Sequence, residues 1–145
     1  MKYLYLFLVS FTLLSCNFNN IYTNRESDKN DAEKVSKKFY WEVLHGSNED
    51  DIFKLFSEQF FNVTNKDKLR ELISVSNNEF GEISEYNLVH WETMVVRGTN
   101  AKSEYILVYD VVRKNAKTQE KFFMINENGV IRIAGYNVNQ DLNTH

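Results

Sequence analysis

Asp110 lies between Tyr109 and Val111, in the most apolar part of the second half of the chain. If its carboxyl group faced the protein interior, desolvation would raise its pKa and suit it to abstracting a proton. The alternative is an Asp on the outer face of a strand, beside Arg113 or Lys121, where it would meet water and do no chemistry. Charged side chains are mostly exposed, so the outer position is the more common one. Asp110 is therefore a candidate catalytic base that depends on which way its strand faces.

His90, Trp91 and Glu92 form the one stretch in which an imidazole, a large aromatic ring and a carboxylate follow each other. Successive strand residues point to opposite faces, so His90 and Glu92 are expected on one face and Trp91 on the other. A His–carboxylate pair without a nucleophile is more often a surface hydrogen bond than a catalytic unit. His90 is the second candidate base, with the surface pair as its alternative.

Aromatic residues are numerous, with 11 Phe and 8 Tyr. Seven Phe residues lie at core spacing and are expected to fill the interior: Phe39, Phe56, Phe60, Phe61, Phe80, Phe122 and Phe123. Tyr105, Tyr109, Tyr136 and Trp91 combine an apolar ring with a polar tip, as small-molecule pockets require, and are the candidate ligand-binding residues. Tyr105 and Tyr109 share a face because they are four residues apart on a strand. The sequence contains no phosphate-binding Gly loop, nucleophile elbow or His-Glu zinc helix.

Charge and cysteine content exclude several classes of function. Lys and Arg number 17 against 20 Asp and Glu, so there is no basic field of the kind that binds nucleic acid. One Cys and three scattered His do not make a structural metal site, and we expect neither a metal nor another cofactor. Hydrophobic residues make up 43% of the 145 residues, which is enough for the core of one globular domain.

Helices are expected first along the chain. Apolar residues recur at spacings of three and four from Asp28 to Leu44, and Gly46 ends that pattern. A capping signal at residues 47–50 predicts a short second helix that closes at Phe60 and Phe61. A further capping signal at residues 64–67 predicts a third helix, which Gly81 ends. Three helices thus occupy residues 28–81.

Strands follow from Ile83 onward, where the apolar period changes to two. Four are expected: Glu85 to Arg97, Lys102 to Lys114, Thr118 to Ile125 and Val130 to Val138. Their connections are too short for parallel crossovers, so the strands form an antiparallel meander. The second strand is apolar on both faces and is expected to be central. The prediction is an α+β fold of three N-terminal helices packed on a bent, four-stranded meander sheet.

The first sixteen residues read as a secretory signal. Met1-Lys2 supplies a positive charge, and an apolar run of about a dozen residues follows, too short for the roughly 20 that cross a bilayer. Leu13-Leu14-Ser15-Cys16 resembles the bacterial lipobox. That resemblance implies diacylglycerol on the Cys16 thiol, cleavage before Cys16 and acylation of the new amino terminus. The alternatives are an ordinary signal peptide with a chance Cys, or a short buried helix.

This interpretation divides the chain into four parts. They are a signal peptide at 1–15, a flexible tether at 16–27, the folded domain at 28–139 and a tail at 140–145. In bacterial lipoproteins, an Asp directly after the lipidated Cys resembles an inner-membrane retention signal, and an acidic cluster there resembles a surface-export signal. Asn17-Phe18-Asn19-Asn20 carries neither. We therefore expect a lipid-anchored protein of the cell envelope, on the periplasmic face of the outer membrane.

Helices followed by a bent meander resemble the cone-shaped, cystatin-like fold of nuclear transport factor two, ketosteroid isomerase and scytalone dehydratase. The resemblance covers residues 28–139. Within it, Phe80-Gly81-Glu82-Ile83 and the closing strand from Val130 to Tyr136 resemble small bacterial envelope domains of unknown function. The resemblance implies a fold, and one fold hosts unrelated activities.

Three functions are open at this point. The favoured one is a non-enzymatic envelope lipoprotein, held to the membrane through Cys16, that binds a small apolar ligand or an envelope protein. The second is a small lyase or isomerase with Asp110 or His90 as its base in a water-poor pocket. The third is a periplasmic inhibitor or immunity-type protein. A deep closed cone favours the first two, and an exposed acidic and aromatic patch favours the third.

Overall fold

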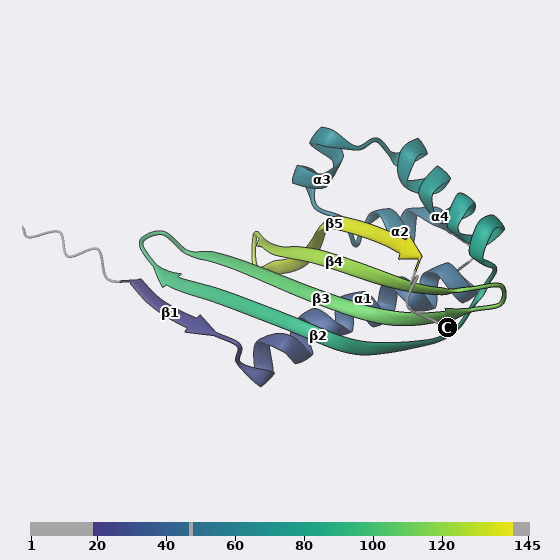
Figure 1. The fold of residues 1–145 in the computed structure, drawn as a ribbon. Coiled ribbons are helices and arrows are strands. Elements are labelled where there is room, and N and C mark those ends of the chain that lie inside the picture. The colour runs from purple at the N-terminus through teal and green to yellow at the C-terminus, as the bar shows by residue number, and fades with distance from the viewer. Residues whose placement is uncertain (1–18, 47, 141–145) are drawn as a thin grey trace, which may run out of the picture.

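The structure is a computed structural model that describes residues 19–46 and 48–140. Its elements are β1 (Asn19–Thr23), α1 (Glu26–His45), α2 (Glu49–Phe53), α3 (Glu58–Val63), α4 (Lys66–Phe80), β2 (Ile83–Gly98), β3 (Lys102–Arg113), β4 (Lys117–Glu127) and β5 (Val130–Gln140). The strands form one antiparallel sheet in the order β1-β2-β3-β4-β5 (Figure 1). The predicted α+β class, the meander and the central place of the strand that begins at Lys102 are confirmed.

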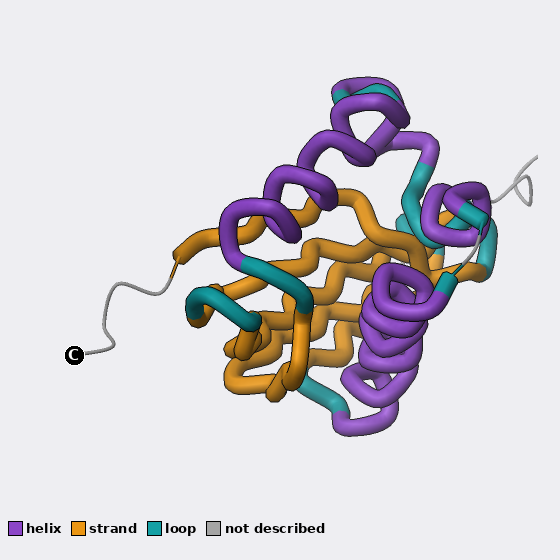
Figure 2. The backbone as a smooth tube through the Cα atoms, turned by 90° about the vertical axis from the view of Figure 1, so that its right-hand side faces the viewer, coloured by secondary structure: helices purple, strands orange, loops and turns teal. Residues whose placement is uncertain are grey.

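Helix α1 packs against one face of the sheet, which we call the inner face (Figures 1 and 2). Every second residue of β3 is buried on this inner face: Tyr105, Leu107, Tyr109 and Val111. On the opposite, outer face, Ile106, Val108 and Val112 of β3 are half-buried, as is the carboxylate residue Glu104, whereas Asp110 is exposed. Phe123, expected in the interior, also lies half-buried on the outer face, as the residue between the buried Phe122 and Met124.

The region predicted as one short second helix contains two helices. Ser57 separates them, because its side-chain oxygen accepts a hydrogen bond of 3.1 Å from the Phe60 N–H and so caps α3. The backbone before α3 pairs with the edge of the sheet. The Ser57 N–H donates to the Ile133 carbonyl at 2.9 Å, and the Ile133 N–H donates to the Leu55 carbonyl at 2.8 Å. Phe60 and Phe61 therefore belong to a separate helix that is held against β5.

The structure also differs from the expected tether at residues 19–27. Residues 19–23 form β1, which pairs with the last part of β2, with Tyr22 opposite Val95. Beyond β1, the Asn24 N–H donates to the Thr93 carbonyl and the Thr93 N–H donates to the Asn24 side-chain oxygen, both at 2.9 Å. The Asn24 side-chain oxygen thus takes the place of a backbone carbonyl as the acceptor for Thr93, and it extends the pairing of β1 with β2 by one residue.

Tyr22 fastens β1 to the rest of the domain. The guanidinium carbon of Arg25 lies 4.1 Å from the centre of its ring, and that of Arg97 lies 5.7 Å from it. Arg25 in turn donates two hydrogen bonds, of 2.7 and 2.9 Å, to Asp28 in the first turn of α1. The predicted signal peptide, Cys16 and the part of the tail from residue 141 onward lie outside the described residues.

Aromatic rings fill the space between α1 and the inner face. The ring centroids of Phe39 and Phe122 are 5.3 Å apart, and Tyr40 stacks on Tyr86 at 4.2 Å. Tyr40 also meets Tyr109 edge-on at 5.4 Å. Such edge-to-face and stacked contacts add to the free energy of burial. The interior beneath the sheet is therefore a packed aromatic core at these positions.

A buried ion pair lies at one end of this core. Arg113 on β3 and Glu120 on β4 have side chains only 2% and 0% exposed, and an Arg113 Nη atom lies 2.6 Å from Glu120 Oε1. The second oxygen of Glu120 accepts a hydrogen bond of 2.6 Å from the Tyr136 hydroxyl on β5. The other Nη atom of Arg113 donates to the Asn77 side-chain oxygen at 3.0 Å and to the Gly81 carbonyl at 3.1 Å. The pair thus connects three strands with the end of α4.

The tyrosines near Glu120 remain protonated. Burial raises the pKa of Tyr136 well above its usual value, and the Glu120 charge raises it further. Burial is also the main reason that the pKa of Tyr40 is raised, with the Glu120 charge second. The Tyr40 hydroxyl is buried and makes no hydrogen bond within the described part of the chain.

Replacing the two tyrosines by Phe is expected to have opposite effects on stability. Tyr136→Phe removes a donor from a buried carboxylate and should lower the free energy of unfolding by about 1–3 kcal/mol. Tyr40→Phe removes a buried hydroxyl that has no partner, and it should leave stability unchanged or raise it. Urea unfolding followed by circular dichroism measures both. An unchanged free energy of unfolding in Tyr136→Phe would contradict its assignment as the donor to Glu120, and a loss in Tyr40→Phe would show that the Tyr40 hydroxyl has a partner.

A chain that begins at Asp28 should be less stable than one that begins at Asn17, because it lacks β1 and the Arg25 contacts. The two hydrogen bonds between Asn24 and Thr93 alone account for a loss of about 1–3 kcal/mol, at roughly 0.5–1.5 kcal/mol for each net bond. Tyr22→Ser in the longer chain should reproduce part of the loss. Ile21→Ser is the matched control, since Ile21 is 64% exposed. Identical urea midpoints for the two chains would show that residues 19–27 act as a tether after all.

Candidate functional site

Asp110 lies on the outer face of β3 and is exposed. Its cross-strand neighbours are Asn87 and Gln119, and the Gln119 amide nitrogen donates to Asp110 Oδ1 at 3.4 Å. The carboxyl group therefore does not face the interior, and the outer-face interpretation is the correct one. The cause is the period of two, since Tyr109 occupies the inner position next to it. The expected neighbour Arg113 lies on the inner face instead.

His90 and Glu92 share the outer face of β2, as predicted. The His90 Nε2 atom lies 2.9 Å from Glu92 Oε1, and both side chains are more than half exposed. Trp91 takes the opposite face, where it is half-buried, with the Lys29 ammonium 5.5 Å from its ring centre. His90 thus makes the surface hydrogen bond that was its alternative interpretation.

Two of the candidate ligand-binding tyrosines are engaged in the core. The Tyr109 and Ser36 hydroxyls share a buried hydrogen bond of 2.6 Å, and the Tyr136 hydroxyl donates to Glu120. Burial raises the pKa of Tyr109, so this hydroxyl also stays protonated. Tyr105 and Tyr109 do share the inner face, as their spacing required. The structure does not gather the three hydroxyls around one pocket, because α1 and neighbouring rings cover the inner face at Tyr109 and Tyr136.

The carboxylate that does point inward is Glu120, which the sequence analysis did not select. Its signal was present in the sequence, because Thr118, Glu120, Phe122 and Met124 alternate with exposed or half-buried residues along β4. Glu120 is held by Arg113 and Tyr136 and lines none of the clefts described below. Its observed contacts are those of a structural ion pair rather than of a base that meets a substrate.

A cleft of about 500 Å³ opens at one end of the sheet, and we call it the open-end cleft. Its lining residues come from the start of α1, from strands β2 and β3 near the turn that joins them, and from the region of the β4–β5 turn. The β2–β3 turn is at the left of Figure 1. Its lining consists of Asp28, Asp31, Val95, Val96, Arg97, Ala101, Lys102, Ser103, Tyr105, Asn126, Gly129 and Ile131. Tyr105 is the one member of the predicted ligand-binding set in this lining. The cleft matches the size of known small-molecule sites, roughly 300–1,000 Å³.

Charges of both signs line the open-end cleft. Asp28 is paired with Arg25, and Asp31 forms a salt bridge of 2.8 Å with Lys34. Lys102 forms a salt bridge of 2.7 Å with Glu104. Ion pairs at a surface contribute little free energy and exchange readily for other partners. Burial raises the pKa of Tyr105, so its hydroxyl is a hydrogen-bond donor at neutral pH.

Within residues 19–46 and 48–140, no group of three or more His, Cys, Asp or Glu side chains is placed to hold a metal ion. None of the described helices has the length and apolar character needed to cross a membrane. The chain matches no protein-family model, and the curated proteins contain no sequence similar to it.

Proposed function

We propose that the protein is a lipid-anchored protein of a bacterial cell envelope whose folded domain binds a small ligand in the open-end cleft. The observation that carries the proposal is the cleft itself, about 500 Å³ in volume and lined by Tyr105 together with charged and amide side chains. Small-molecule sites combine apolar surface with placed polar groups, and this cleft contains both, with more polar lining than most such sites have. The lining favours a ligand with polar groups over the purely apolar ligand expected from the sequence.

We favour binding over catalysis because none of the three candidate acid–base side chains, Asp110, His90 and Glu120, faces a cleft. Asp110 and His90 are exposed on the outer face, so neither side chain lies in a water-poor pocket where it could act as a base on a bound substrate. Glu120 is inward but is held by Arg113 and Tyr136. A lyase or isomerase would need one of these groups beside a substrate-sized space.

The proposed anchor is the acylated Cys16 of the lipobox-like sequence Leu13-Leu14-Ser15-Cys16. Because β1 begins at Asn19, only Asn17 and Phe18 separate Cys16 from the sheet. A lipid on Cys16 would therefore hold the domain close to the membrane surface rather than at the end of a long tether. The absence of an Asp or an acidic cluster after Cys16 supports the periplasmic face of the outer membrane.

We also place the domain among cystatin-like folds. Support comes from the order of its elements, with helices before a long antiparallel meander, and from α1 packed on one face of that sheet. The fifth strand, β1, is an addition at the edge next to β2. Since such a fold hosts unrelated activities, it supports the architecture and not a reaction.

A protein partner is the second candidate, and the outer face of the sheet favours it. Ile106, Val108 and Phe123 lie there half-buried, and Ile21 on β1 is 64% exposed. In the described part of the chain, α1 packs on the other face of the sheet. Apolar surface that is contiguous and rimmed by polar residues marks many protein interfaces. An inhibitor or immunity-type role would use this face.

Native mass spectrometry of the detergent-solubilised lipoprotein, purified from its own cells, tests the binding function. We expect a bound small molecule in the wild type and in Asp110→Asn. Ala101→Trp should abolish it, because Ala101 lines the open-end cleft and the larger side chain would fill that space. Thr99→Trp, in the same turn but outside the lining, is the matched control.

Retention of the small molecule in Ala101→Trp would place its site elsewhere and overturn the assignment to this cleft. Loss of the molecule in Asp110→Asn would favour the outer face or chemistry at that residue. A co-purified protein that Ile106→Glu releases, without any small molecule, would establish the second candidate instead.

Metabolic labelling with a fatty-acid analogue tests the anchor. The wild type should be labelled, and Cys16→Ala should carry no label, because the thiol is the acceptor of the lipid. The signal peptide of Cys16→Ala should stay uncleaved or be cleaved at a different position. Ser15→Ala keeps a small residue before Cys16 and is the matched control that should label normally. Equal labelling of the wild type and Cys16→Ala would refute lipidation at this residue.

A further inference from the structure

A second cleft, of about 330 Å³, lies between α2 and α4, and we call it the α2–α4 groove. Its lining consists of Glu49, Ile52 and Phe53 from α2 and Arg70, Ile73, Ser74, Asn77 and Asn78 from α4. It shares no residue with the open-end cleft. Ile52, Phe53 and Ile73 supply an apolar wall, and the charged and amide groups lie around it. This combination is that of a small amphipathic ligand site.

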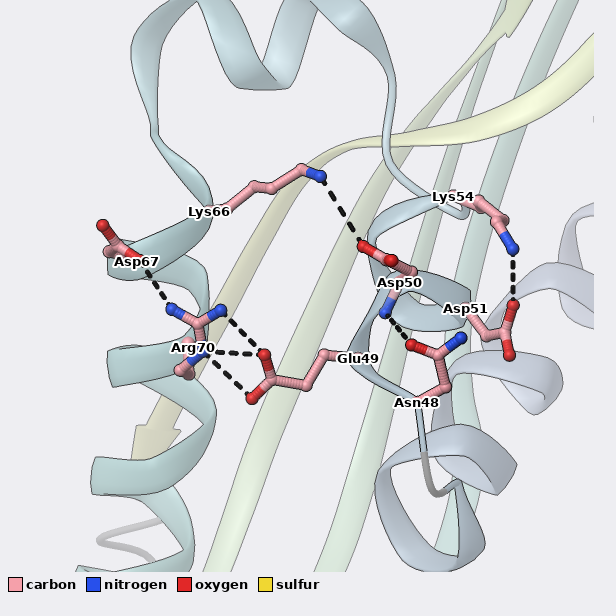
Figure 3. A network of polar contacts seen from close by, with 8 residues as sticks. All are labelled: Asn48, Glu49, Asp50, Asp51, Lys54, Lys66, Asp67 and Arg70. Carbon is pink, nitrogen blue, oxygen red and sulfur yellow. Dashed lines mark hydrogen bonds and ion pairs between the residues drawn. The ribbon is translucent and has the colours of Figure 1, made fainter.

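One ion pair spans the two helices beside the groove. In Figure 3, Arg70 on α4 and Glu49 on α2 point toward each other across the space between the helices. The Arg70 Nε atom lies 2.8 and 3.0 Å from the two Glu49 oxygens, and one Nη atom lies 2.7 Å from Oε2. The other Nη atom donates to Asp67 Oδ1 at 2.5 Å. Arg70 and Glu49 are the one cation and the one anion in the lining of the groove.

This ion pair can open at low cost. The side chains of Arg70 and Glu49 are 47% and 55% exposed, and ion pairs that exposed contribute little to stability. Both side chains can rotate without disturbing the core. The Arg70 hydrogen bonds hold the pKa of Glu49 below its usual value, so Glu49 carries its charge at neutral pH. A ligand that offers equivalent partners can therefore replace the pair.

Further charges near the groove select the kind of ligand. The Lys66 Nζ atom lies 3.7 Å from Asp50 Oδ1 (Figure 3). The same ammonium group lies 4.9 Å from the centre of the Phe53 ring. A simple anion that took Arg70 would leave Glu49 unpaired beside Asp50 and Asp67. A simple cation that took Glu49 would be repelled by Arg70 and Lys66. Like charges at such distances are unfavourable, so neither class replaces the pair without a loss.

The far end of the groove offers a donor. The Asn77 side-chain oxygen is already engaged by the buried Arg113, at 3.0 Å. That contact fixes the orientation of the amide, so that its NH₂ group is what Asn77 can present to a ligand. An acceptor such as a carbonyl oxygen would be satisfied there.

We propose that the α2–α4 groove binds a small zwitterion with an apolar side chain, that is, an apolar amino acid or dipeptide. Its carboxylate pairs with the Arg70 guanidinium, and its ammonium group pairs with the Glu49 carboxylate, so both side chains keep a partner of opposite charge. Its apolar side chain lies against Ile52, Phe53 and Ile73. A dipeptide carbonyl would accept from Asn77. The volume of about 330 Å³ fits ligands of this size and excludes long peptides.

Titration of the full chain with three related compounds tests the ligand class. L-Phenylalanine carries both charges, 3-phenylpropionate lacks the ammonium group, and 2-phenylethylamine lacks the carboxylate. Chemical shifts of backbone amides in α2 and α4 should saturate with L-phenylalanine. Each of the other two compounds should bind at least about tenfold more weakly, since a hydrogen bond to a charged group is worth about 1.5–3 kcal/mol. Equal binding of 3-phenylpropionate, or no saturation with any of the three, would overturn the proposal.

Variants locate the site. Arg70→Gln and Glu49→Gln should each weaken L-phenylalanine binding about tenfold or more. Ile73→Trp should abolish it by filling the groove. Lys54→Gln is the matched control, because Lys54 pairs with Asp51 away from the groove lining (Figure 3). Unchanged urea midpoints verify that the charge variants fold.

The same titration separates this site from the open-end cleft. Ala101→Trp blocks that cleft and should leave L-phenylalanine binding unaltered. If Ala101→Trp abolished binding and Ile73→Trp did not, the ligand would occupy the open-end cleft and the α2–α4 groove would be refuted as its site.

Discussion

The buried pair of Arg113 and Glu120 constrains more of this domain than any other interaction. Removing two charges from water costs several kcal/mol for each, and that cost is offset only when every donor and acceptor finds a partner. Arg113 and Glu120 meet this requirement with a hydroxyl from β5, an amide from α4 and a carbonyl at Gly81. The positions of β3, β4, β5 and the end of α4 are therefore coupled to one another. Pairs of this kind contribute to a unique arrangement more surely than to a high stability.

The turn at Gly81 shows how tightly the end of α4 is fitted to the sheet. Gly81 has a φ of +83°, and a Cβ atom there would lie 2.7 Å from the Lys114 Cβ atom. Only glycine accommodates both the left-handed backbone and the close approach. The Phe80 carbonyl accepts from the Asn115 N–H at 2.9 Å just beyond the turn. Because Arg113 also holds Asn77, the buried pair orients an amide of the α2–α4 groove at the same time.

The inner face stabilises the fold, and the binding functions we propose lie at its margins. Aromatic rings and the Arg113–Glu120 pair occupy the inner face beneath α1, so the tyrosines that looked suited to a ligand serve the core. Space remains where elements end, at the turns around Tyr105 and between α2 and α4. Side chains at such margins keep one side in water, which leaves their ion pairs free to exchange for a ligand.

The sequence by itself determined the long helix, the four strands of the meander and the residues that share a face. These features depend on apolar periods and short turns, which are local along the chain. The separation of Asp110 from Tyr109 and the inward position of Glu120 both follow from a period of two. The sequence did not indicate which face of β3 the helix α1 would cover, because both faces of that strand are largely apolar. It therefore did not determine whether Asp110 would lie in solvent or in the interior.

Only the tertiary structure decided the contacts between segments far apart in the chain. The sequence of β1 has no clear strand pattern, and only Tyr22 in it is half-buried. The strand forms by pairing with β2, with Tyr22 opposite Val95, more than seventy residues away in the chain. Arg70 and Glu49, 21 residues apart, meet because α2 and α4 lie side by side. The two clefts also form between elements that are distant in the sequence. The apolar pattern within one helix or strand does not indicate which other element will lie beside it. The apolar period along a helix or strand determines which of its side chains share a face. The packing of the elements against one another determines which other residues those side chains contact.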